Sequence, residues 1–100
     1  MTVVTRSHNR ITLKGHAGYA KPGEDIVCAG VSALVQTLIK SIEDLTADKI
    51  EYSISPGSVD ITHGNLSKQA QTLVSSFFVG IQMIADEYPA NVQIAQACKA

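Results

Sequence analysis

The chain has 100 residues, of which 45% are hydrophobic, and its eight basic and nine acidic residues leave a formal net charge of −1. This length fits a single domain with one hydrophobic core, so we expect one domain over residues 1–100. The lysines are scattered along the chain and there are only five aromatic residues, which argues against a nucleic-acid partner.

The N-terminal segment has the alternation of two short strands. Ile11, Leu13 and Gly15 alternate with polar residues, which predicts strands over residues 3–6 and 10–16, joined at Ser7-His8-Asn9. Residues 17–24 contain two glycines and a proline but no hydrophobic period. They predict a flexible loop.

A helix is expected to begin at Asp25, where the period changes to 3.6. Its apolar stripe comprises Val27, Val31, Leu34, Val35, Leu38, Ile42 and Leu45. Asp25 is a favourable N-cap residue, because its carboxylate can accept hydrogen bonds from the first turn. The stripe predicts about five helical turns.

The second half repeats the pattern of two strands and a helix. Alternation predicts strands over residues 50–54 and 59–62, separated by Ser55-Pro56-Gly57-Ser58, which suits a type II turn. A second helix should begin near Asn65 or Ser67 and run to about Tyr88, before Pro89. Its apolar face comprises Ala70, Leu73, Val74, Phe77, Ile81 and Ile84.

A last strand around Val92 and Ile94 completes the order ββαββαβ. This order predicts an α+β domain in which two helices pack on one face of a mainly antiparallel sheet.

No membrane partner or export is expected. The apolar run 77–85 is far shorter than a spanning helix, and the N-terminus lacks the pattern of a signal peptide. Cys28 and Cys98 are too few for a disulfide framework, so the cytoplasm is the expected compartment. Cys98 has no partner motif and is interpreted as a tail thiol.

Cys28 and His16 are the residues with the strongest chemical signal. With Asp25 as the N-cap, Cys28 falls in the first helical turn at the edge of the core stripe, where unpaired N–H groups and the helix dipole favour a thiolate. His16 lies before the loop, twelve residues earlier. The loop is long enough to permit contact between the two side chains but does not impose it.

Other interpretations of these residues stay open on spacing alone. A lone cysteine beside a core more often packs as a small hydrophobe. Zinc binding by His8, His16, Cys28 and His63 matches no paired ligand spacing, and we expect no metal and no cofactor. The pair Phe77-Phe78 lies within the second apolar stripe and is expected to belong to the core.

Two segments together resemble the ribosomal-processing cysteine protease family of bacteria. They are Gly15-His16-Ala17-Gly18 and the run from Gly23-Glu24-Asp25-Ile26-Val27-Cys28 through Ala29-Gly30-Val31-Ser32-Ala33-Leu34. The resemblance implies a Cys28 nucleophile with His16 as general base. It places Asp25 and Ser32 at the family's supporting positions, and Gly15, Gly18 and Gly23 in the supporting or substrate-binding segments.

The resemblance also implies a partner and an assembly. Known members are homodimers that remove the N-terminal tail from the precursor of large-subunit ribosomal protein twenty-seven, cutting after paired aromatic residues, with the glycine-rich loop covering the site. Related folds in phage genomes have virion precursors as targets, so both substrates remain expectations.

Three functional hypotheses follow for this chain. The first is a cysteine endopeptidase; the alternatives are a non-enzymatic dimeric peptide-binding module and a redox-sensing thiol protein. Asp25 either caps the helix, orients His16, or does both. Ser32 is either a substrate contact or a tolerated boundary residue.

Overall fold

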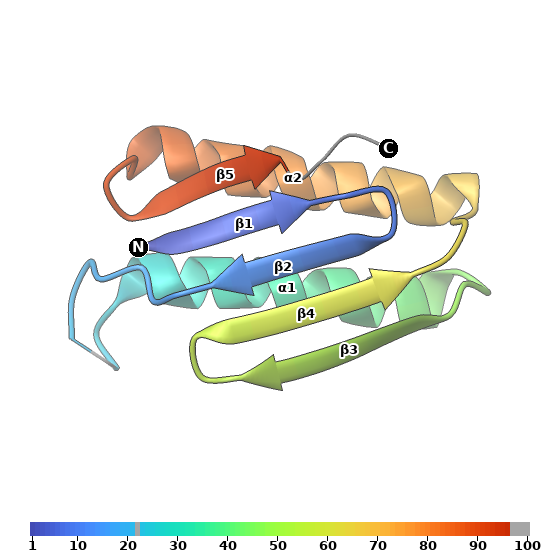
Figure 1. The fold of residues 1–100 in the computed structure, drawn as a ribbon, viewed down its shortest axis with the longest axis horizontal. Helices are drawn as coiled ribbons and strands as arrows, with labels where there is room; N and C mark the ends of the chain where they lie inside the picture. The colour runs from blue at the N-terminus through green and yellow to red at the C-terminus, as the bar shows by residue number, and fades with distance from the viewer. Residues whose placement is uncertain (22, 97–100) are drawn as a thin grey trace.

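The computed structural model describes residues 1–21 and 23–96 and shows five strands and two helices in the order ββαββαβ (Figure 1). The strands form one sheet in the order β3-β4-β2-β1-β5, and both helices lie behind it in this view. All neighbouring strands are antiparallel except the parallel pair β1 and β5. The predicted α+β fold with helices on one face is confirmed. The elements are β1 (Thr2–Arg6), β2 (Arg10–Lys14), α1 (Ile26–Leu45), β3 (Ile50–Ser55), β4 (Ser58–His63), α2 (Lys68–Glu87) and β5 (Val92–Gln96).

The β1–β2 hairpin buries one face against the helices. Val4, Ile11 and Leu13 are each at most 3% exposed, as the alternation predicts. Strand β2 was expected to reach His16, but it ends at Lys14. Gly15 has a φ of +93°, which is incompatible with a continuing strand, and the chain leaves the sheet there.

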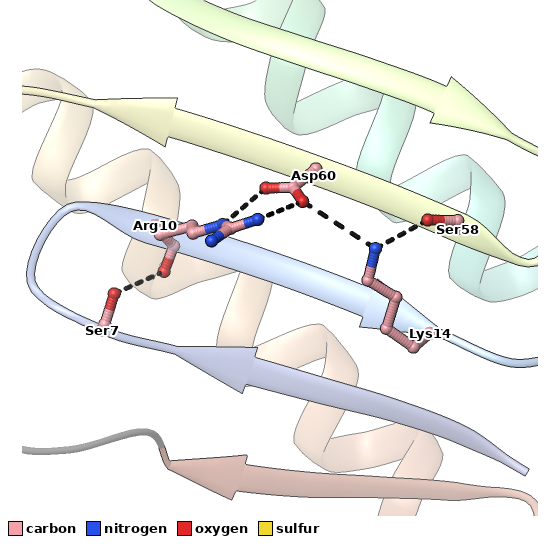
Figure 2. Close-up of polar contacts among 5 residues, drawn as sticks. All are labelled: Ser7, Arg10, Lys14, Ser58 and Asp60. Carbon is pink, nitrogen blue, oxygen red and sulfur yellow. Dashed lines mark hydrogen bonds and ion pairs between the residues drawn. The ribbon is translucent and has the colours of Figure 1, made fainter.

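The β3–β4 hairpin is held against β2 by polar side chains on the open face of the sheet (Figure 2). Arg10 donates two hydrogen bonds to the Asp60 carboxylate, and Lys14 Nζ donates one to Ser58 Oγ at 2.7 Å. Exposed pairs of this kind add little to stability, but a bidentate pair is geometrically specific. They fix the register that brings the β3–β4 turn beside the end of β2.

Helix α1 packs its predicted stripe on the sheet, with Val27, Val31, Val35, Leu38 and Ile42 buried. Leu45 was expected on this stripe but is 69% exposed, because the helix ends there and the chain turns away. The apolar run 77–85 is not the best candidate for membrane insertion. Helix α1 is long and apolar enough to span a membrane by composition, a property that core helices share, and a third of its most apolar stretch is buried.

Helix α2 begins where Ser67 caps it, within the predicted range. The Ser67 hydroxyl accepts from the Ala70 N–H and donates to Asp48, whose pKa is lowered first of all by this bond. Phe77 is buried as expected. Phe78 is only partly buried, and its ring lies 4.8 Å from the Arg6 guanidinium carbon, an ordinary cation–π distance.

Strand β5 returns the chain to the N-terminus, pairing in parallel with β1 from Thr2 opposite Val92 to Arg6 opposite Gln96. Asn91 precedes it and accepts the Thr2 N–H at 2.9 Å through its carbonyl. The tail thiol predicted at Cys98 lies outside the described residues.

Candidate active site

One cleft contains both His16 and Cys28. It has a volume of about 470 Å³ and is walled by the segment after β2, the first turns of α1 and the β3–β4 turn. Gly15 and Ser32 also line it, so four of the predicted site residues meet at this point. Its floor is apolar and is formed by Leu13, Val31, Val35 and Val59. A cleft with an apolar floor and a few polar groups is typical of a site that binds an organic side chain.

Cys28 lies in the first turn of α1 and is half-buried, as its position beside the core stripe predicts. Its N–H donates to Asp25 Oδ1 at 2.9 Å. The sequence predicts that unpaired N–H groups at the start of this helix favour a thiolate. The N–H of Cys28 is engaged by Asp25, so this particular group is not free for that purpose.

His16 follows Gly15 out of the sheet, and two hydrogen bonds fix the backbone of Gly15. A Cβ on Gly15 would overlap the Met1 carbonyl oxygen. The Gly15 N–H donates to the Gly57 carbonyl at 2.9 Å, and the Gly15 carbonyl accepts from Thr2 Oγ1 at 3.1 Å. Gly15 is therefore required both for its positive φ and for its lack of a side chain.

The imidazole of His16 lies against the β3–β4 turn. A Cβ on Gly57 would lie 2.9 Å from His16 Nε2, closer than a real side chain allows, and Gly57 itself has a φ of +70°. Pro56-Gly57 signals a turn in the sequence, and a positive φ at Gly57 is what a type II turn requires. Its contact with His16 has no sequence signal, because the two residues are 41 positions apart.

Asp25 confirms the predicted N-cap and also holds the loop. Oδ1 accepts from the Cys28 N–H, while Oδ2 accepts from the N–H groups of Tyr19 at 2.9 Å and Ala20 at 3.3 Å. The hydrogen bond from Cys28 is the largest cause that lowers the pKa of this carboxyl. All three bonds run to backbone N–H groups, so an effect of Asp25 on His16 passes through residues 17–20.

The loop after His16 is tied down at its start. Ala17 is 1% exposed, and its carbonyl accepts from Asn91 Nδ2 at 2.9 Å. The ring of Tyr19 meets the ring of Tyr88 edge to face, with 5.2 Å between centroids. Gly18 and Gly23 both have positive φ and do not line the cleft.

The four residues considered for zinc lie in two places. His8 and His63 line a hollow with the β1–β2 turn, whereas His16 and Cys28 line the cleft. No group of three or more histidine, cysteine or acidic side chains gathers to hold a metal within residues 1–21 and 23–96. The geometry therefore separates the four side chains that a shared zinc site needs.

Comparison with known proteins decides the family. The family model described as cysteine protease Prp matches residues 1–93. This chain belongs to the Prp family of cysteine proteases. The family is enzymatic, which decides against a non-enzymatic binding module and a redox-sensing thiol protein as its class.

Relatives support the assignment along most of the chain. The ribosomal processing cysteine protease Prp of Staphylococcus aureus strain Mu50 is 31% identical over 87 residues, covering 84% of this chain and 82% of that protein. Its counterpart in Bacillus subtilis strain 168 is 27% identical and covers 91% of each.

A solved structure shares the fold closely. The crystal structure of an essential ribosomal processing protease Prp from S. aureus, in complex with a covalently linked product peptide, superposes with a TM-score of 0.92. It is 25% identical and covers 97% of this chain and 100% of that one.

Replacing Asp25 by asparagine tests the two roles of the carboxylate. An amide has one acceptor oxygen, so it can keep the helix cap or the bonds to Tyr19 and Ala20, but not both. We expect peptide cleavage at pH 7 to fall on the order of 10²-fold through misplacement of the loop, with the protein still folded.

The loss of stability in Asp25→Asn should depend on pH. Asp25 has a pKa below its ordinary 3.8, so its stabilising contribution is complete above the unfolded-state pKa and is lost as the pH falls through the folded-state value. Urea midpoints of wild type and Asp25→Asn should thus differ most at neutral pH and converge as the pH falls below 3.8 and through the folded-state pKa. Asp44→Asn, at the far end of α1, is the control. A difference that does not change with pH would contradict the role of the carboxylate.

Proposed function

We propose that this protease removes the N-terminal extension of a ribosomal protein precursor, with Cys28 as nucleophile and His16 as general base. The observation that carries the proposal is that His16 and Cys28 line one cleft in a chain of the Prp family. The ribosomal processing proteases of S. aureus and B. subtilis to which this chain is similar support ribosomal processing as the role.

The chemistry is acyl transfer in two halves. His16 takes the proton from Cys28, and the sulfur attacks the carbonyl carbon of the scissile peptide bond. His16 then gives the proton to the leaving nitrogen, the C–N bond breaks and a thioester remains on Cys28. Water attacks the thioester, leaving its proton on His16; the C–S bond breaks and the thiol is restored.

The other predicted residues support this reaction. Ser32 lies one turn after Cys28 in α1, is exposed and lines the same cleft, which supports a contact between its hydroxyl and the bound peptide. We infer that the loop between Gly18 and Gly23 covers the bound peptide, and that its movement about these glycines requires release of the hydrogen bonds from Tyr19 and Ala20 to Asp25. Closure of such a cover admits an extended chain more readily than a folded domain.

The proposal includes a compartment, the cytoplasm, and an oligomeric state, the homodimer. A ribosomal precursor is met in the cytoplasm, and catalysis by a free thiolate suits a reducing compartment. A homodimer is what the resemblance to the family implies.

The experiment is mass spectrometry of a ribosomal protein precursor whose tail contains two adjacent phenylalanines. We expect wild type to cut after this pair, and Cys28→Ala and His16→Ala to leave the precursor intact. A phage capsid precursor with a similar tail is the comparison. If only the capsid precursor is cut, the ribosomal substrate is wrong and the dyad stands; if neither is cut, the proposed function is wrong.

A further inference from the structure

Strand β3 is an edge strand of the sheet, and neither α1 nor α2 covers its helix-side face (Figure 1). Tyr52 and Ile54 alternate as an inward face requires, and they pair with Ile61 and Val59 on β4. Yet Tyr52 is 47% and Ile54 52% exposed, while Ile61 is 1% exposed. Helix α1 runs behind β2 and β4, and β3 lies beyond it (Figure 1). Tyr52 and Ile54 thus lie beside α1 without being covered by it.

The space beside these two side chains is a groove of about 540 Å³ between α1 and β3. Gln36 and Lys40 line it from α1, and Tyr52 and Ile54 from β3. Gln36 and Ile54 also line the cleft that contains Cys28. The groove is therefore a continuation of that cleft along the helix.

The dimensions of the groove suit an extended peptide. Cys28 and Lys40 are both in α1, and at ~1.5 Å per residue they lie roughly 18 Å apart along its axis. At ~3.3 Å per residue, this length accommodates about five residues of extended chain. The outer edge of β3 also carries main-chain N–H and C=O groups that no neighbouring strand of the sheet pairs, and extended peptides bind such edges.

We propose that this α1–β3 groove binds the segment of the substrate on one side of the scissile bond, with Tyr52 and Ile54 contacting its apolar side chains. The inference rests on the proposed function. It explains why an edge strand keeps two large apolar residues uncovered, because a passing peptide buries them during each turnover.

The test compares three peptides that copy a cleavable precursor tail. One has five residues on each side of the cut, and shorter versions lack the outer three residues on one side or the other. For wild type, removing one of the two flanks should lower kcat/KM at least tenfold. The variant Tyr52→Ser/Ile54→Ser should have a kcat/KM at least tenfold below wild type on the long peptide, mainly through a higher KM. Removal of the flank that matters for wild type should not change the kcat/KM of this variant.

The matched control is Glu51→Ser/Ser53→Ala, which alters the same strand on its opposite face. It should cleave all three peptides like wild type. Alkylation of Cys28 by iodoacetamide should proceed at the wild-type rate in both variants, because neither replaces Cys28 or His16. Tyr52 and Ile54 are about half exposed, so we expect both variants to keep the fold. Circular dichroism and the melting temperature, compared with those of wild type, check this.

The outcomes separate the two proposals. Wild-type kinetics for Tyr52→Ser/Ile54→Ser on the long peptide would overturn the groove and leave the proposed function intact. Equal losses on long and short peptides, with a change of oligomeric state in sedimentation, would instead make the groove a contact between two copies. If wild type cuts none of the tail peptides, the proposed function itself is wrong.

Discussion

Cys28→Ala and His16→Ala are each expected to reduce kcat for peptide cleavage by on the order of 10⁴-fold to 10⁶-fold. In the proposed mechanism the nucleophile and the base act as one unit, so the double variant should be no slower than Cys28→Ala alone. Both side chains line the cleft, His16 is exposed and Cys28 is only half-buried, so the folded state should survive. Product formation measured by mass spectrometry gives the rates, and thermal melting checks the fold.

His8→Ala is the control, because His8 is an exposed histidine in the β1–β2 turn. It should retain wild-type kcat. A second readout is alkylation by iodoacetamide: the wild type should react faster at Cys28 than at Cys98, and His16→Ala should slow only the reaction of Cys28. If His16→Ala keeps more than about a tenth of the activity, the imidazole is not the general base.

Gly57→Ala is expected to reduce cleavage on the order of 10²-fold, although Gly57 does not take part in the chemistry. The new Cβ would lie 2.9 Å from His16 Nε2, so the imidazole has to move away. Stability should also fall by roughly 1–2 kcal/mol, because alanine tolerates a left-handed backbone poorly. Urea unfolding measures the loss of stability, and kcat with the rate of Cys28 alkylation measures the displacement of His16.

Gly57→Asn separates backbone strain from the contact with the ring. Asparagine accepts a positive φ more readily than alanine, but it carries the same Cβ. The asparagine variant should recover most of the stability and little of the activity. Recovery of both would show that only the turn conformation matters and that His16 does not depend on the space at Gly57.

Hydrophobic periodicity predicts which segments form helices and strands. It does not predict where every element ends or which strand lies at an edge of the sheet. The buried stripe of α1 and the cap at Asp25 were predictable, because both depend on residues within a few turns. The end of β2 and the exposure of Leu45 were not, since a backbone angle at Gly15 and the path after Thr46 decide them. Alternation in β3 indicates a strand with one apolar face, but only the strand order shows that this strand is at an edge.

The candidate site shows the same division. His16 and Cys28 flank one loop, so they could be predicted as site residues from a motif local in sequence. Gly57 was interpreted only as a turn residue, because its contact with His16 arises from the pairing of β2 with β4. The bonds from Asp25 to Tyr19 and Ala20 depend on the loop conformation, which residue types alone do not define.

The parallel pairing of β1 with β5 has a consequence for how the chain is made. His16, Cys28 and Gly57 all come from residues 10–63, so the walls of the cleft leave the ribosome well before the sheet is complete. Strand β1 waits for β5, about 90 positions later, and contacts so distant in sequence form slowly. During synthesis, β1 therefore presents an unpaired edge that is open to other chains. The residues that wall the cleft are therefore made before the strand that covers this edge, and the edge stays open until β5 is synthesised.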